Sequence, residues 1–380
     1  RWGADAVKNM YIKGGLATEY TIAFSRVSAL NAEENKVTTK KSIEVPGTRW
    51  GKFYFMNILD EIDVPGEYFI DNANKMLYFY PISDDIENSE LVVSQLETAV
   101  ISGEGAAWVT LKDLDFAYSK MTPVNIKGNH ITIDGCTVSD IGENAVTAVG
   151  TDITVKNCNI FDIAGNGINL ECPEENREKL IPDGNRIINN RIHNTSRISQ
   201  SVSYPVTIGY ANGLEIANNE IYDCSGMAIR LWRANDVTIR DNEIYNALRY
   251  TSDNGAIYWG RDITTLGNRV LHNYIHDVGN EYGGYGTQGV FTDDCGSGPY
   301  MADNILYKAG TYAYKTNCGN YSKLENNLII DTPHAGYFQV VPQSRYWLKV
   351  VGKWPNADGS PDPWGQWTYN KGEQYMQNEL

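Results

Sequence analysis

The chain has 380 residues, and its 47 Asp and Glu outnumber its 32 Lys and Arg, for a formal net charge of −15. This acidic balance disfavours nucleic acid and anionic membrane surfaces as partners, because both would repel the protein. No run of 18 apolar residues indicates a transmembrane helix. Because the first residue is Arg and not Met, we expect a processed or trimmed chain. We also expect the protein to be located outside the cell, in the periplasm or at the cell surface.

Residues 1–90 consist of short alternating runs of apolar and polar residues, which are typical of β-strands. Two aromatic runs, EYFID and MLYFYP, flank the segment from Asn72 to Lys75, so a hairpin is predicted there. This part of the chain therefore forms a small β-rich module, placed before or inserted into the next domain.

Residues 91–340 repeat a short segment in which one residue, most often Asn, precedes an apolar strand. The repeated positions are Leu114, Cys136, Cys158, Asn190, Asn219, Asn242, Asn273, Asn304 and Asn327. They are separated by 22, 22, 32, 29, 23, 31, 31 and 23 residues, which indicates a coil of 22 residues with insertions in some coils. A fixed period is typical of a solenoid, and buried Asn side chains can hydrogen-bond from coil to coil. The predicted fold is all-β, a right-handed parallel β-helix.

Residues 341–380 lose this repeat and contain Trp347, Trp354, Trp364 and Trp367. An uncovered last coil would expose strand edges, so we expect this irregular tail to cap the solenoid.

The six cysteines do not have the spacing of a zinc site. Cys136 and Cys158 lie one coil apart, as do Cys295 and Cys318, and adjacent strands are about 4.8 Å apart. Either pair could therefore form a disulfide. The alternative is that these thiols fill the interior as small apolar groups.

One strand of each coil can be aligned with its neighbours on the cysteine positions, and the alternation of side chains then separates two faces. The residues predicted to point inward are Ile229, Ile257, Phe291 and Tyr314. Those predicted to point outward are Arg230, Tyr258, Thr292 and Lys315, with Asp294 and Asn317 further along. Three insertions, TSRISQSVSYP, NALRYTSDNG and VGNEYGGYGTQG, precede this strand, which indicates a binding cleft on its outward face.

Four carboxylates, Asp253, Asp262, Asp293 and Asp294, gather around the same strand. Cleavage of a glycosidic bond needs two carboxyl groups, one protonated and one ionised, and crowding separates their pKa values. Two other interpretations stay open for the Asp293–Asp294 doublet, because Asp is common in turns and because clustered oxygens can bind Ca²⁺. No cofactor is required by the hydrolytic interpretation.

Several other side chains around this strand are candidates for binding a sugar. His276 is expected to face the cleft, and Arg230 and Lys315 to lie outward on the sheet, where a solvated surface explains them equally well. Aromatic rings from Tyr258, Trp259, Tyr282 and Tyr285 could stack on sugar rings, although Trp259 could instead fill the interior. His272, next to a repeated Asn, is interpreted as a turn residue.

The segments RWGKFYFMNILDEIDVPGEYFIDNANKMLYFYP (49–81), DNGAIYWGRDITTLGNRVLHNYIHDV (253–278) and GVFTDDCGSG (289–298) resemble bacterial β-helix glycoside hydrolases of family 141, a group with α-L-fucosidase and xylanase activities. The resemblance implies catalysis by two aspartates, which match Asp253 and Asp294 here. Asn254, Thr292 and Cys295 depart from the family's usual residues.

These observations predict a glycoside hydrolase acting on an oligo- or polysaccharide, with fucoside- or xylan-type linkages implied by the resemblance. A straight strand would hold Asp253 and Asp294 about 20 Å apart, too far for a catalytic pair, so either Asp253 folds over the strand or Asp262 is the partner of Asp294. Two alternatives remain: a lyase using Lys315 or Arg230 on a uronate-containing glycan, and a glycan-binding solenoid without catalysis.

Overall fold

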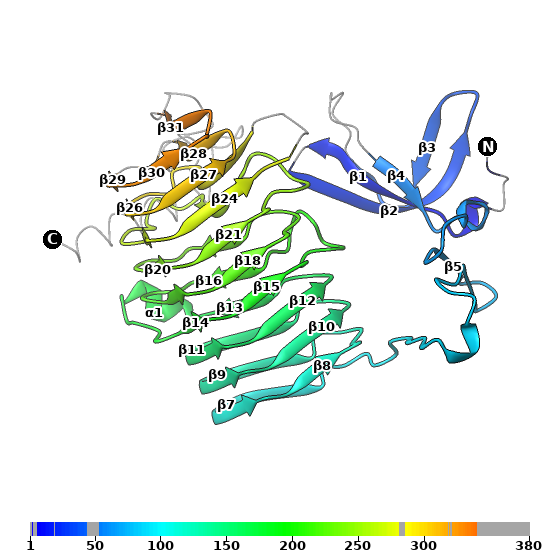
Figure 1. Ribbon diagram of the computed structural model, residues 1–380, viewed down its shortest axis with the longest axis horizontal. Helices are drawn as coiled ribbons and strands as arrows, with labels where there is room; N and C mark the ends of the chain where they lie inside the picture. Colours follow the sequence, from blue (N-terminus) through cyan, green and yellow to red (C-terminus); the bar gives the residue numbers. More distant parts are fainter. Residues whose placement is uncertain are drawn as a thin grey trace, which may run out of the picture. The chain divides into compact units, whose positions relative to one another are not determined.

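The computed structural model describes residues 2, 6–18, 20–43, 53–280, 286–317, 319 and 321–339 (Figure 1). The chain divides into two compact units, Arg1–Val93 and Ser94–Leu380. The Trp-rich segment 341–380, with its predicted capping role, lies outside the described residues. In the part that is described, no helix combines the length and the apolar character needed to cross a membrane.

The first unit is built from short strands around a small apolar cluster that includes Met10, Ile12 and Val27. Its described elements are η1 (Ala6–Lys8), β1 (Tyr11–Thr18), β2 (Thr21–Asn31), β3 (Lys36–Thr39), β4 (Phe53–Met56), η2 (Leu59–Glu61), β5 (Tyr68–Asp71), β6 (Met76–Phe79) and η3 (Ile86–Asn88). The strands β3-β2-β1-β4 form an antiparallel sheet, and β5 pairs with β6. The predicted hairpin is confirmed, and the Asp71 carboxylate accepts the backbone N–H groups of Ala73 and Asn74 in its turn.

The second unit is a parallel β-helix whose coils present strands on three faces (Figure 1). Face 1 contains β13 (Ile168–Glu171), β16 (Val206–Gly209), β19 (Ile229–Trp232), β22 (Asn254–Gly260), β25 (Thr287–Asp293), β28 (Tyr312–Asn317) and β31 (His334–Gln339). Face 2 contains β14 (Arg186–Ile188), β17 (Glu215–Ala217), β20 (Thr238–Arg240), β23 (Arg269–Leu271), β26 (Tyr300–Ala302) and β29 (Lys323–Glu325). The long strands β7 (Ile101–Lys112), β9 (Val124–Asp134) and β11 (Val146–Lys156) contribute to both faces.

Face 3 confirms the predicted coil repeat. It contains β8 (Asp115–Ala117), β10 (Thr137–Ile141), β12 (Asn159–Ile163), β15 (Arg191–His193), β18 (Glu220–Tyr222), β21 (Glu243–Tyr245), β24 (Tyr274–Val278), β27 (Ile305–Ala309) and β30 (Leu328–Ile330). Their Cα partners reproduce the predicted steps of 22, 22, 32, 29, 23, 31, 31 and 23 residues. Each coil adds an apolar side chain to the same buried column, for example Ile192, Ile221 and Ile244.

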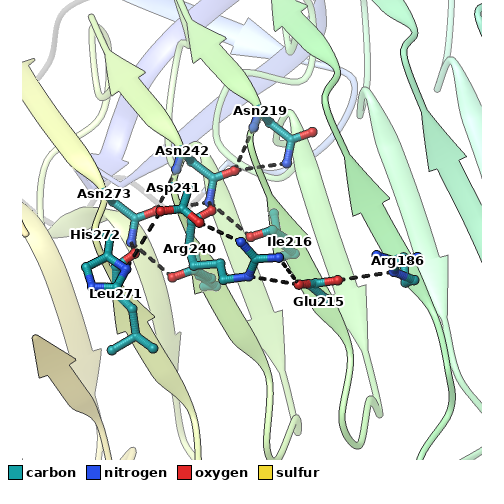
Figure 2. Close-up of polar contacts among 11 residues, drawn as sticks. Arg186, Glu215, Ile216, Asn219, Arg240, Asp241, Asn242, Leu271, His272 and Asn273 are labelled. Carbon is teal, nitrogen blue, oxygen red and sulfur yellow. Dashed lines mark hydrogen bonds and ion pairs between the residues drawn. The ribbon is translucent and has the colours of Figure 1, made fainter.

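The repeated asparagines form a ladder along the solenoid, part of which Figure 2 shows. In each of Asn190, Asn219, Asn242, Asn273 and Asn304, the backbone N–H and the side-chain amide both donate to the Oδ1 of the next Asn, ending at Asn327. The side-chain amides also donate to backbone carbonyls, such as that of Ile216. The ladder thus satisfies polar groups at a buried turn that water does not reach.

A row of charged residues accompanies the ladder on the outside of face 2 (Figure 2). Glu215 lies between Arg186 and Arg240, with N–O distances of 3.1 and 2.8 Å. His272 adopts a left-handed backbone conformation (φ 54°) and lies 3.7 Å from Asp241, which supports its interpretation as a turn residue. Exposed ion pairs of this kind contribute little to stability.

The described cysteines are buried. Cys136, Cys158, Cys172 and Cys224 are free thiols, so Cys136 and Cys158 do not form the disulfide that their spacing allowed. Burial raises the pKa of the Cys158 thiol to about 12, which keeps it protonated and unreactive at neutral pH. Cys295 is also buried, and its predicted partner Cys318 lies outside the described residues.

Candidate functional site

The predicted insertions all lead into strands of face 1. They connect β15 to β16, β21 to β22 and β24 to β25. These three insertions are therefore concentrated at one edge of this face, whereas the insertion with the helix Glu174–Glu178 follows the face, between β13 and β14. Loops gathered on one face of a solenoid are where binding sites are expected.

The outward row of face 1 differs by one residue from the predicted row at β25. Ile229, Ile257 and Tyr314 point inward and Arg230, Tyr258 and Lys315 outward, as predicted. However, the residue in register with Tyr258 and Lys315 is Phe291, whereas Thr292 is in register with the core residue Trp259. Phe291 and Thr292 therefore exchange their predicted faces, because a one-residue slip in register reverses every side chain.

The cause of this error is the cysteine alignment. Cys295 and Cys318 are 23 residues apart in the sequence, whereas the paired residues Val290 and Tyr314 are 24 apart. After β25 the chain leaves the strand through Asp294 and Cys295, which both adopt left-handed conformations with φ of 43° and 67°. The cysteine therefore marks a turn and not the strand register.

As a consequence, Asp293, the last residue of β25, lies on the outward surface in place of Asp294, which was predicted there. Asp293 pairs with Gly260 in register, and its carboxylate accepts hydrogen bonds from Tyr258 Oη (2.9 Å) and Asn317 Nδ2 (2.7 Å). It also accepts the backbone N–H of Asp294 at 2.8 Å, so it stabilises its own turn as well. Three neighbouring strands, β22, β25 and β28, thus contribute to one polar cluster.

The Asp293 carboxyl has a perturbed acidity. Its burial, together with the negative charges of Asp294 and Asp253, raises its pKa to about 6, although the hydrogen bonds from Tyr258 and Asn317 act in the opposite direction. Burial and the charge of Asp293 in turn raise the pKa of the Tyr258 phenol well above its ordinary value. Near neutral pH, this carboxyl can therefore hold or release a proton.

Asp253 reaches the same surface because the chain does not run straight. A Cβ on Gly255 would lie 2.6 Å from the carbonyl oxygen of Ile257 and 2.7 Å from the backbone nitrogen of Phe291, so only glycine fits this bend. Asp253 itself is left-handed (φ 55°), and its Oδ1 lies 3.3 Å from Lys315 Nζ. The insertion therefore folds Asp253 back over the sheet, as one of the two sequence-based alternatives required.

Lys315 is the cation that contacts Asp253. Its side chain is 9% exposed and its ammonium lies 4.4 Å from the ring centroid of Phe291. A nearly buried ammonium beside a carboxylate favours the ionised form of that carboxylate. Asp253 is thus ion-paired with Lys315 on the same surface as Asp293, whose carboxyl retains a proton more readily than an ordinary aspartate.

Asp294 lies in the turn beside this cluster. Its Oδ2 accepts a hydrogen bond from Arg261 Nε at 3.0 Å, and the Asp294 side chain is 8% exposed. Arg261 is 59% exposed and also left-handed (φ 62°). The predicted site residue Asp294 is therefore close to Asp293 but engaged in an ion pair.

Asp262, the alternative partner, belongs to a different environment. It is fully buried, and its Oδ2 lies 3.0 Å from Nη2 of Arg177, which comes from the short helix α1 (Glu174–Glu178). Its other oxygen accepts hydrogen bonds from the backbone and hydroxyl groups of Thr264. Asp262 thus fastens an insertion to the solenoid and is not brought together with Asp253 and Asp293.

Two of the predicted sugar-binding residues lie elsewhere. His276 is on face 3, where its ring stacks on Tyr245 at 5.0 Å and its nitrogens contact Glu243 and Asp277, so it does not lie on the surface where the cleft was predicted. Trp259 is fully buried in the core, which confirms its alternative interpretation and not the sugar-stacking one. Tyr282 and Tyr285 lie outside the described residues.

Other residues of the site had no sequence signal of their own. Arg261 follows the strand without a motif, and Trp232 and Tyr204 are aromatic residues among many in the chain. The coil alignment would have found Trp232, because it occupies the outward position two residues after Arg230 on β19. Among the described residues, no group of three or more His, Cys, Asp or Glu is arranged to hold a metal ion.

A family model and a solved structure support the β-helix fold. The model of the family described as "Right handed beta helix region" matches residues 75–203 and 180–341. A solved structure described as "Glycoside hydrolase" is similar with a TM-score of 0.58 and 15% identity, covering 86% of this chain and 68% of that one. The A-module of the mannuronan C-5 epimerase AlgE4 from Azotobacter vinelandii is similar with a TM-score of 0.47 and 15% identity over 61% of this chain and 64% of its own. No curated protein sequence matches the chain. The extent of the family match shows that the chain belongs to the right-handed β-helix family.

Proposed function

We propose that the protein is a glycoside hydrolase whose catalytic pair is Asp293 and Asp253. The observation that supports this proposal is the pairing of opposite environments: a buried carboxyl whose pKa is raised to about 6, and a carboxylate 3.3 Å from a lysine ammonium. Glycosidases need two carboxyl groups that flank the scissile bond, one protonated and one ionised.

In the proposed reaction, protonated Asp293 donates its proton to the leaving glycosidic oxygen as the bond from the anomeric carbon to that oxygen breaks. Asp253 either attacks the anomeric carbon directly or removes a proton from the attacking water. Tyr258 and Asn317 hold the Asp293 carboxyl in place, and the ammonium of Lys315 holds the Asp253 carboxylate. In both routes water supplies the proton and the hydroxyl group that the products gain.

The resemblance to family 141 favours Asp294 as the partner of Asp253, and this remains the alternative assignment. We favour Asp293 because the hydrogen bonds from β22 and β28 converge on it, whereas Asp294 accepts from Arg261 in the turn. The substrate class that we propose is a fucoside- or xylan-type oligo- or polysaccharide outside the cell. The similarity to a structure described as a glycoside hydrolase supports this proposal at the level of fold.

The proposal is tested by product analysis on a panel of aryl glycosides and plant and host glycans. Reducing ends and the ultraviolet absorbance of unsaturated uronates are measured together, with and without EDTA. New reducing ends without the absorbance, unaffected by EDTA, are expected for the hydrolase. Products that carry the absorbance would instead identify a lyase, and binding without any product would identify a glycan-binding solenoid.

The pH dependence of the reaction follows from the acidity of Asp293. A general acid must be protonated in the free enzyme, and the pKa of Asp293 is raised to about 6. We therefore expect kcat/KM to fall about tenfold for each pH unit above this value. Measuring kcat/KM from pH 4 to pH 9 checks this; a rate that stays level well above pH 6 would exclude Asp293 as the acid.

A further inference from the structure

Next to the proposed catalytic pair, the outward surface of face 1 holds one aromatic residue between two glycines. Trp232 is in register with Gly209 on one side, and Gly260 follows in the same row on the other, since Leu231 pairs with Trp259. A Cβ on Gly260 would lie 2.5 Å from the carbonyl oxygen of Asp293, so no larger residue fits there. Along this row from coil to coil, Trp232 is therefore followed by Gly260, which has no side chain, and then by Asp293.

Two guanidinium groups lie over this indole, that of Arg230 and that of Arg233, whose guanidinium carbon is 5.8 Å from the ring centroid. The guanidinium carbon of Arg230 is 5.0 Å from the ring centroid of Trp232 and 5.8 Å from that of Tyr204, a residue of the insertion before β16. The two rings hold the guanidinium in place through cation–π contacts. Arg230 is in register with Tyr258, the residue that donates to Asp293, so it borders the proposed site directly.

Arg230 differs from the other cations of this surface because the described residues provide it with no carboxylate partner. Lys315 contacts Asp253 at 3.3 Å, Arg261 contacts Asp294 at 3.0 Å, and Arg233 contacts Glu174 at 3.5 Å. A positioned guanidinium with no internal counter-ion is suited to an external anion, which it can bind through two parallel hydrogen bonds.

We propose that Trp232 and Arg230 form a subsite for an anionic sugar residue, one that carries a carboxylate or a sulfate. The rings of Trp232 and Tyr204 position the guanidinium of Arg230, which pairs with the anionic group on the side of Tyr258. Strands β19 and β25 are two spacings apart, so the subsite lies about 10 Å from Asp293 along the solenoid. This inference rests on the proposed function, because it names the substrate class of the same site.

The charges around the subsite determine where the anion is placed. Glu171 is in register with Gly209, and its Cγ would lie 3.3 Å from a Cβ at that position, so its carboxylate borders the subsite on the side away from Asp293. An anionic group is repelled there and attracted to Arg230. The overall charge of −15 weakens long-range attraction, so the preference depends on this contact and on salt.

Direct binding to the full chain tests the subsite without requiring turnover. The probes are matched pairs: glucose against glucuronate, xylotetraose against xylotetraose with one glucuronic acid branch, and 2′-fucosyllactose against its sulfated form. Dissociation constants are measured by calorimetry for the oligosaccharides and by ligand-observed NMR for the monosaccharides. We expect the acidic member of at least one pair to bind about 10- to 100-fold more tightly at low salt. The uronate and sulfate arms distinguish the two anionic groups.

Arg230→Gln is expected to abolish the preference for the acidic member while the neutral member binds as before. Arg269→Gln, which removes an exposed arginine of face 2, is the matched control and should change neither. Equal binding of acidic and neutral probes, no binding of any probe, or an unchanged preference in Arg230→Gln would overturn the subsite. Hydrolysis is followed separately. A preference for the acidic probes that Arg230→Gln abolishes, without any hydrolysis product, would contradict only the proposed function. Hydrolysis products without a preference for acidic probes would contradict only the subsite.

Discussion

Replacing Asp293 by Asn is expected to lower kcat/KM about 10²- to 10⁴-fold on natural glycosides, the range that a general acid contributes. The variant should stay folded, because an amide has the shape of the carboxyl group and its oxygen still accepts from Asn317 and from the backbone of Asp294. Steady-state kinetics on a natural substrate and on an aryl glycoside with a strongly acidic phenol measure the loss.

The leaving group identifies the role of each carboxyl. An acidic phenol departs without a proton, so Asp293→Asn should lose little activity on such a substrate, and the fall in kcat/KM above pH 6 should disappear. Asp253→Asn should lose activity on both substrates, because attack on the anomeric carbon is then impaired. Asp331→Asn, an exposed turn residue paired with Lys308 at 4.0 Å, is the matched control. If Asp294→Asn is inactive while Asp293→Asn is active, the acid is Asp294 and our assignment is wrong.

Replacing Asn242 by Ala is expected to reduce the free energy of unfolding by about 3–5 kcal/mol, because several buried polar groups lose their partners at once. The backbone N–H and side-chain amide of Asn219 both lose the Oδ1 acceptor that they contact at 2.9 Å. The carbonyl oxygens of Ile216 and Arg240 lose a donor at 3.0 Å. No water reaches this turn to replace these bonds, since Asn242 is 2% exposed.

Urea unfolding followed by circular dichroism measures this loss as a lower midpoint. The matched control is Asn125→Ala, the same substitution at an exposed outward position of β9, which should change the free energy by no more than about 0.5 kcal/mol. A loss below 1 kcal/mol for Asn242→Ala would show that neighbouring coils relax to satisfy the groups left behind. The ladder would then be a consequence of the fold and not a source of its stability.

The sequence predicted the solenoid well, because its evidence is local and repeated. Most coils place an Asn at the same turn, and each places an apolar residue after it, so an error in one coil is corrected by the others. The position of the insertions before face 1 followed from the same register. The outward position of Arg230, Tyr258 and Lys315 was predicted for this reason, and the structure agrees.

The details of the candidate site could not be predicted in the same way. His276 lies in the middle of β24, shortly before an insertion, and the sequence alone did not show that this strand belongs to face 3. Asp262 is of a residue type that is common in active sites. Only the packing of α1 against it reveals its buried ion pair with Arg177. Trp259 lies in the same segment as Tyr258, but alternation along β22 sends the two side chains to opposite sides.

The sequence by itself therefore determined the coil register, the ladder and the face that carries the insertions, because a periodic pattern constrains all coils together. Only the tertiary structure decided which carboxyl groups meet. The contact of Lys315 with Asp253 joins residues 62 apart, and that of Tyr258 with Asp293 joins residues 35 apart. Both depend on features that occur once and have no period: the bend at Gly255 and the left-handed turn at Asp294 and Cys295. A shift of one residue at either place would exchange the core and the outer surface, so the site follows from packing between coils and not from the repeat.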